Sequence, residues 1–223
     1  MMPFPGGIEA TANGALVLSV AAALFTLLMV ERPASLRKSA VKTLAVALLA
    51  VLAAAAHGPA LLILALALSA LGDAFLSREG ERAFMAGLTS FLAAHLAYLA
   101  LFVTGAAHGF LLGSGPWQPI AGGVMVVFAA AMAFVLARRV APGLRGPIVA
   151  YAAAILAMGL SALATRNPWV IAGAVSFIVS DGILATEKFL TAAVSPNRSA
   201  MRHAVWITYY VAQLIITLGV VLA

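Results

Sequence analysis

The sequence lacks cysteine and is poor in charge. Because cysteine does not occur among the 223 residues, disulfides, a thiolate nucleophile and a thiolate metal site are excluded. Charged residues make up 9% of the chain, whereas soluble proteins typically contain about 25%. Hydrophobic residues account for 64%, and no polar stretch is long enough for a soluble domain. The composition therefore predicts a polytopic membrane protein, with residues 1–223 forming one membrane domain.

The basic residues exceed the acidic ones and give a formal charge of +6. A basic excess of this size is found in nucleic-acid-binding proteins, where the Lys and Arg residues cluster on one solvent-exposed face. Here the basic residues are dispersed among short connections between apolar runs. We therefore expect no nucleic-acid partner, and interpret the basic residues as signals of membrane topology.

Long apolar runs predict the fold class. A membrane-spanning helix needs roughly 20 predominantly apolar residues. By this measure the chain is an all-α bundle of eight transmembrane helices, separated by turn-forming proline, glycine and asparagine residues. The predicted spans are 13–30, 40–56, 60–77, 83–106, 118–138, 147–164, 168–188 and 200–222.

The distribution of charge predicts the orientation of the spans. No Lys or Arg precedes the first apolar run, so that run lacks the positive start of a secretory signal and is predicted to be a retained span. Apart from Lys42, at the inner start of the second span, and Arg166, every basic residue lies in an odd-numbered connection. The positive-inside rule then places these connections in the cytosol and both termini outside. Short loops and alanine-rich spans favour the cell membrane, specifically a bacterial inner membrane.

Two carboxylates lie inside apolar runs. Asp73 precedes the inner end of its span by four residues and Asp181 precedes Lys188 by about seven, so they lie roughly 6 Å and 10 Å deep. Lys42 begins the second span at a similar level. A charged side chain in a span costs about 2.5–3.5 kcal/mol on insertion scales, which makes each Asp a candidate functional residue.

Two interpretations of these carboxylates stay open. In the first, each pairs with Lys42, an arginine or backbone donors and only locks the bundle. In the second, their environments differ, so that one stays protonated as an acid while the other stays ionised. Such a split is what acid-catalysed cleavage of an ether-like bond requires.

Polar and aromatic residues recur at helical spacing on two spans. Gly87, Phe91, His95 and Tyr98 share one face of the fourth span, and such faces suit the inside of a bundle. A lone histidine there is either an interhelical strut or an aid to proton transfer and substrate binding. On the eighth span the corresponding face carries His203, Trp206, Tyr210 and Gln213.

Other chemistries have less support in the sequence. Two Asp and two His suit zinc in type, but there is no local ligand motif and His95 lies deeper than the carboxylates. Ser180 lies beside Asp181 without the G-x-S-x-G elbow of a serine hydrolase. No nucleotide-binding loop is present. We therefore predict neither a metal nor a cofactor.

Five segments resemble the YhhN-type integral membrane family, whose characterised animal members are lysoplasmalogenases. They are LGDAFL at 71–76, FLAAHLAY at 91–98, the span containing Tyr151–Met158, FIVSDGILA at 177–185 and YVAQ at 210–213. Their order and spacing cover nearly the whole chain. One departure is Thr43 after Lys42, where the resemblance leads us to expect proline.

The resemblance implies hydrolysis of the vinyl ether bond of a lysoplasmalogen to a fatty aldehyde and a glycerophospho-alcohol. A lysolipid in the membrane would be the substrate, Asp73 and Asp181 the acid/base pair, and Lys42 the residue that attracts the phosphate. His95, Tyr98, Ser180, Tyr210 and Gln213 would bind the substrate's polar atoms. The alternatives are a transporter of small lipids or metabolites whose carboxylates carry protons, and a purely structural membrane protein.

Overall fold

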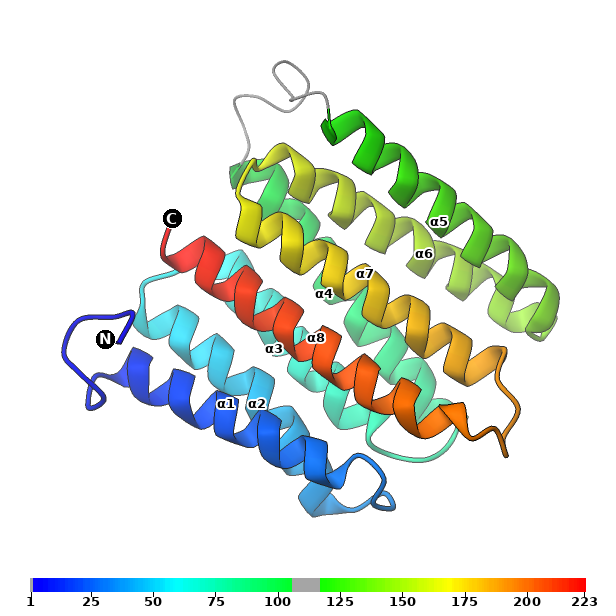
Figure 1. Ribbon diagram of the computed structural model, residues 1–223, viewed down its shortest axis with the longest axis horizontal. Coiled ribbons are helices and arrows are strands. Elements are labelled where there is room, and N and C mark those ends of the chain that lie inside the picture. Colours follow the sequence, from blue (N-terminus) through cyan, green and yellow to red (C-terminus); the bar gives the residue numbers. More distant parts are fainter. Residues whose placement is uncertain (1, 106–116) are drawn as a thin grey trace. The chain divides into compact units, whose positions relative to one another are not determined.

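The fold is all-helical (Figure 1). The computed structural model describes residues 2–105 and 117–223, and within them every regular element is an α-helix. The elements are α1 (Thr11–Met29), α2 (Leu36–Ala55), α3 (Ala60–Leu76), α4 (Glu81–Gly105), α5 (Trp117–Arg139), α6 (Pro142–Ala164), α7 (Pro168–Phe189) and α8 (Asn197–Val221). The predicted all-α class is confirmed for these residues. Residue 106, where the predicted fourth span ends, lies outside them.

Seven of the helices are long and apolar enough to cross a membrane, which makes the chain a multi-pass membrane protein. The exception is α3, whose 17 residues span about 26 Å at 1.5 Å per residue. The hydrocarbon core of a bilayer is about 30 Å thick, so α3 is short for a crossing. The eighth crossing and the outer location of both termini stay predictions.

The starts of three helices differ by three or more residues from the sequence-based bounds. The Ser35 side chain accepts a hydrogen bond from the Lys38 amide, so α2 begins four residues before the predicted residue 40. The predicted start of α6 at Pro147 is wrong, because the helix begins at Pro142 and contains Pro147. Proline suits the first helical position, where its missing N–H is not needed. Similarly, α8 begins at Asn197 rather than at residue 200.

The helices divide between two compact units. The first comprises Met1–Tyr98 and Thr217–Ala223, and the second comprises Leu99–Ile216. Within the first unit α1 packs on α2, and α2 packs on α3 (Figure 1). Within the second unit α5 packs on α6, and α7 contacts both. Asp73 therefore belongs to the first unit and Asp181 to the second.

Glycines bring α3 and α4 close together. A Cβ atom at Gly72 would lie 2.7 Å from two ring carbons of Phe91, and one at Gly87 would lie 2.7 Å from the Leu76 side chain. The two antiparallel helices thus pair Leu76 with Gly87 and Gly72 with Phe91. One turn deeper along α3, the Leu68 carbonyl accepts a hydrogen bond of 2.7 Å from Ser90 of α4. The contact between α3 and α4 therefore brings the helix that carries Asp73 beside the helix that carries His95 and Tyr98.

The second unit exposes an apolar helix. Met125 and Leu136 are the buried side chains of α5, whereas Ile120, Val124 and Val127 are more than 60% exposed. Such exposure suits contact with lipid. At the other end of the unit, Leu136, Val140 and Ile148 form a buried cluster against Phe189 and Leu190. This cluster fixes the end of α7 that carries its charged residues.

Candidate functional site

Asp73 forms an ion pair with Lys42 between two neighbouring helices. The Nζ atom of Lys42 on α2 lies 3.0 Å from Oδ1 of Asp73 on α3. Only 1% of the Asp73 side chain is exposed, against 23% of the Lys42 side chain. The structure therefore joins two residues that the sequence placed at a similar level. A buried carboxylate with an ammonium at hydrogen-bond distance is stabilised in its ionised form.

His95 and Tyr98 are fully buried on α4. Because a carbonyl oxygen can only accept, the contact of 2.6 Å between His95 Nδ1 and the Phe91 oxygen means that Nδ1 carries a hydrogen. In the neutral ring, Nε2 is then the acceptor. His95 follows Ser90 by five residues on α4, so it lies deeper than the Leu68 carbonyl that Ser90 contacts and deeper still than Asp73. The predicted inward face of α4 is confirmed by the burial of Phe91, His95 and Tyr98.

Asp181 has a neutral partner in the second unit. The hydroxyl of Tyr151 on α6 donates a hydrogen bond of 2.6 Å to Oδ2 of Asp181 on α7, and both side chains are half-buried. Sequence reasoning did not include Tyr151 among the site residues. The sequence pattern could have identified Tyr151, because it shares a helical face with the apolar residues Ile148, Ile155 and Met158, which are buried.

The remaining candidates lie on α7 and α8. Ser180 donates a hydrogen bond of 3.0 Å to the carbonyl of Val205, which leaves only its oxygen lone pairs for a ligand. Trp206 and Tyr210 stack with their ring centroids 5.9 Å apart. Gln213 is fully buried. The predicted inward face of α8 is thus confirmed from Trp206 to Gln213, while substrate binding by these residues stays a prediction.

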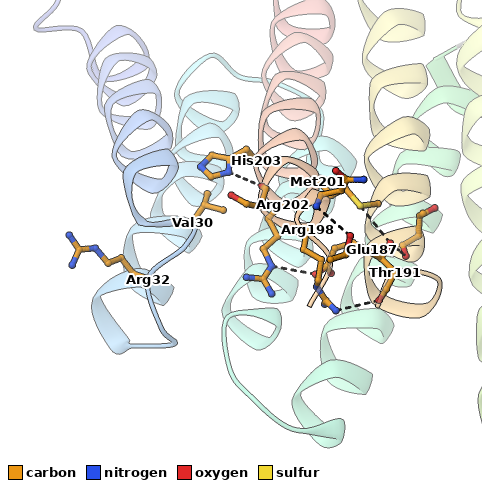
Figure 2. A network of polar contacts seen from close by, with 12 residues as sticks. Val30, Arg32, Glu187, Thr191, Arg198, Met201, Arg202 and His203 are labelled. Atoms are coloured by element: carbon orange, nitrogen blue, oxygen red, sulfur yellow. Dashed lines mark hydrogen bonds and ion pairs between the residues drawn. The ribbon is translucent and has the colours of Figure 1, made fainter. Parts of the chain in front are cut away.

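A further carboxylate, buried like Asp73, was missed by the sequence reasoning. Glu187, near the end of α7, is 6% exposed and forms ion pairs with Arg198 and Arg202 of α8 (Figure 2). The Arg202 Nε lies 3.3 Å from Glu187 Oε1, and Arg198 also donates to the Thr191 carbonyl at 3.5 Å. Glu187 precedes Lys188 at a charged connection, so its position suggested solvent exposure. The two arginines, which were interpreted from the sequence as topology signals, also stabilise the connection between α7 and α8.

We expect Glu187→Gln to lower the free energy of unfolding by about 1–3 kcal/mol, because two arginines lose their charged partner. The loss is moderated by solvent, since 46% of the Arg202 side chain is exposed. Denaturation in detergent, followed by circular dichroism, measures the change. Glu79→Gln removes a charge from an exposed position and should shift stability by less than about 0.5 kcal/mol. Equal effects of the two substitutions would contradict a stabilising role for the Glu187 cluster.

The described residues contain no group of three or more His, Asp or Glu side chains that could hold a metal ion. The site residues instead form two polar centres, one in each unit. The first contains Lys42 and Asp73, with His95 and Tyr98 deeper in the same unit. The second contains Tyr151 and Asp181.

A family model decides the relationship of this chain to known proteins. The YhhN family model matches residues 37–220. The chain belongs to the YhhN family. The match begins in the first turn of α2 and extends into the last turn of α8, so it contains both polar centres and every candidate site residue. A search of curated proteins found no match, and neither did a search of solved structures. YhhN membership agrees with the resemblance seen in the five sequence segments.

Proposed function

We propose that this YhhN-family protein hydrolyses the vinyl ether bond of lysoplasmalogen-like lysolipids. The products are a fatty aldehyde and a glycerophospho-alcohol. The observation that carries the proposal is the difference between the two intramembrane carboxylates. Asp73 contacts an ammonium group, whereas Asp181 accepts a hydrogen bond from a neutral phenol. The Lys42 ammonium beside Asp73 thus carries a positive charge, whereas the Tyr151 hydroxyl beside Asp181 carries none.

This difference suggests a role for each residue. A vinyl ether is cleaved by protonation of the carbon that is not bonded to oxygen, which forms an oxocarbenium ion. Asp181 in its protonated form supplies that proton, with Tyr151 holding the carboxyl group in place. The ionised Asp73 stabilises the cation and accepts a proton from the attacking water.

The remaining steps balance the protons. Addition of water gives a hemiacetal, which collapses to the aldehyde and the alcohol as the hydroxyl proton passes to the leaving oxygen. Asp73 has then gained one proton and Asp181 has lost one, and exchange with bulk water restores both. The Lys42 side chain is 23% exposed, and the positive charge of its ammonium group suits a lysolipid phosphate as well as Asp73.

The deciding experiment measures aldehyde release by the purified protein in detergent. Lysoplasmalogen should be cleaved without any proton gradient. The matched control substrate carries the same headgroup and a saturated alkyl ether, which cannot be protonated on carbon and should stay intact. Absence of aldehyde from the vinyl ether substrate would overturn the proposal. Gradient-dependent uptake into proteoliposomes, without cleavage, would instead support the transporter.

A further inference from the structure

Ser69 on α3 has a buried hydroxyl group without a partner in the described part of the chain. The residue is fully buried, and its Oγ forms no hydrogen bond. A buried polar group left without a partner costs about 1–3 kcal/mol. Such a group is therefore a candidate for binding a ligand or a water molecule during function.

Most other intrahelical hydroxyls have a hydrogen-bond partner, whereas the buried hydroxyls of Ser69 and Thr43 have none in the described residues. A serine or threonine in a helix usually donates to a carbonyl of the preceding turn or to a neighbouring helix. Ser77 follows the first pattern, with a bond of 2.7 Å to the Asp73 carbonyl, and Ser90 follows the second, with a bond of 2.7 Å to the Leu68 carbonyl. Further residues of both kinds are Ser19, Thr26, Thr89, Thr104, Ser161, Ser176, Ser180, Thr186 and Thr208.

Ser69 lies on the same face of α3 as Asp73. The two residues are four positions apart, so their Cβ atoms are separated by about 5–6 Å. Side chains on a helix lean toward its N-terminus, which directs the carboxylate of Asp73 toward the turn that carries Ser69. Two oxygens about 5 Å apart are bridged by one water that forms two hydrogen bonds of about 2.8 Å.

The neighbouring helices offer apolar side chains at this level. The hydrogen bond of 2.7 Å from Ser90 to the Leu68 carbonyl places Ser69 near the level of Phe91 of α4, which is buried. The contact of Lys42 with Asp73 places Ser69 about level with Ala45 of α2, which is fully buried. Phenylalanine and alanine have no polar side-chain atom, so neither residue can satisfy the Ser69 hydroxyl through its side chain.

We propose that Ser69 and Asp73 together hold the water molecule that attacks the oxocarbenium ion. This inference rests on the proposed hydrolytic function and adds a positioning residue to it. The Ser69 hydroxyl donates to the water oxygen, and the Asp73 carboxylate accepts one of the water hydrogens. As the water oxygen bonds to the oxocarbenium carbon, that hydrogen passes to Asp73 as a proton, and the neutral hemiacetal forms. Ser69 is neither protonated nor deprotonated in this step.

The first test compares three variants in the aldehyde assay. Ser69→Ala should lower kcat by about tenfold, the effect of losing one positioning hydrogen bond, while KM changes by less than about twofold. Ser69→Thr keeps the hydroxyl and should recover most of the lost rate. Ser90→Ala is the matched control, because it removes a nearby serine whose bond to Leu68 serves packing. It should leave kcat within about twofold of the wild type.

The second test measures which nucleophile is captured. In the wild type, the water held by Ser69 and Asp73 excludes methanol, so aldehyde should dominate in water–methanol mixtures. Ser69→Ala leaves room for a methyl group, and mass spectrometry of the quenched reaction should show a higher ratio of methyl mixed acetal to aldehyde. A loss of packing alone would slow both products equally.

The outcomes separate this inference from the proposed function. An inactive wild type overturns the hydrolytic function and the water site with it. An active wild type with an unchanged kcat and an unchanged product ratio in Ser69→Ala overturns the water site alone. A slower Ser69→Ala with a higher acetal ratio, rescued by threonine, supports the assignment.

Discussion

Asp181→Asn is expected to lower the rate of aldehyde release by about 100-fold to 10,000-fold, the usual contribution of a positioned general acid or base. Asparagine keeps the size of the side chain and can still accept the hydrogen bond from Tyr151, but it has no acidic proton to deliver. The loss should appear in kcat, because protonation of the vinyl carbon belongs to the transition state. Single-turnover assays in detergent, with folding checked by circular dichroism, measure the effect.

Two companion variants sharpen this expectation. Tyr151→Phe removes the hydroxyl that donates to Asp181 at 2.6 Å and should lower kcat by about tenfold, since it loosens the acid without removing it. Glu79→Gln removes an exposed charge and should leave the rate unchanged. If a folded Asp181→Asn variant kept the wild-type rate, Asp181 would not be the acid.

Lys42→Met should produce the largest loss of stability among these variants. It leaves the Asp73 carboxylate buried without its ammonium partner, and breaking such a pair costs about 3–5 kcal/mol. Asp73→Asn should cost less, because the Lys42 side chain is 23% exposed and its charged end can turn to solvent. The double variant should recover most of the loss, since no unpaired charge remains. Denaturation in detergent of all four proteins forms the double-mutant cycle.

This cycle also tests the interpretation that Asp73 only locks the bundle. A coupling energy below about 0.5 kcal/mol would show that the two sites are energetically independent, in conflict with the ion pair. A large coupling in a double variant that is stable but inactive would show that the Lys42–Asp73 pair has a role beyond stability. A stable double variant with wild-type activity would instead support the locking interpretation.

The sequence predicted the helices better than the contacts between them. Apolar runs of span length located all eight helices of the described residues, because the cost of burying backbone without hydrogen bonds leaves few alternatives in a membrane. Proline was the main source of error. Pro147 resembled a helix boundary, but the boundary is Pro142, and a proline five residues into the helix interrupts only the first turns.

The polar centres could be predicted only in part. The cost of intramembrane charge identified Asp73 and Asp181, and depth along the helix placed Lys42 near the level of Asp73. Tyr151 and Ser69 were missed, because the partner of a side chain depends on the rotation of each helix about its axis. Glu187 was missed for a different reason. It lies beside Lys188, and only the fold of the α7–α8 connection buries it against Arg198 and Arg202.

The shortness of α3 has a consequence for the lipid around it. If the predicted topology holds, a helix about 4 Å shorter than the hydrocarbon core produces hydrophobic mismatch, which a bilayer relieves by thinning locally. Thinning brings phosphate groups and water closer to the end of α3, where Asp73 precedes the last residue by one turn. A lysolipid then needs little vertical displacement for its ether linkage to reach the carboxylate. The shortness of α3 thus means that local thinning of the bilayer, rather than a vertical movement of the substrate, brings the ether linkage to the depth of Asp73.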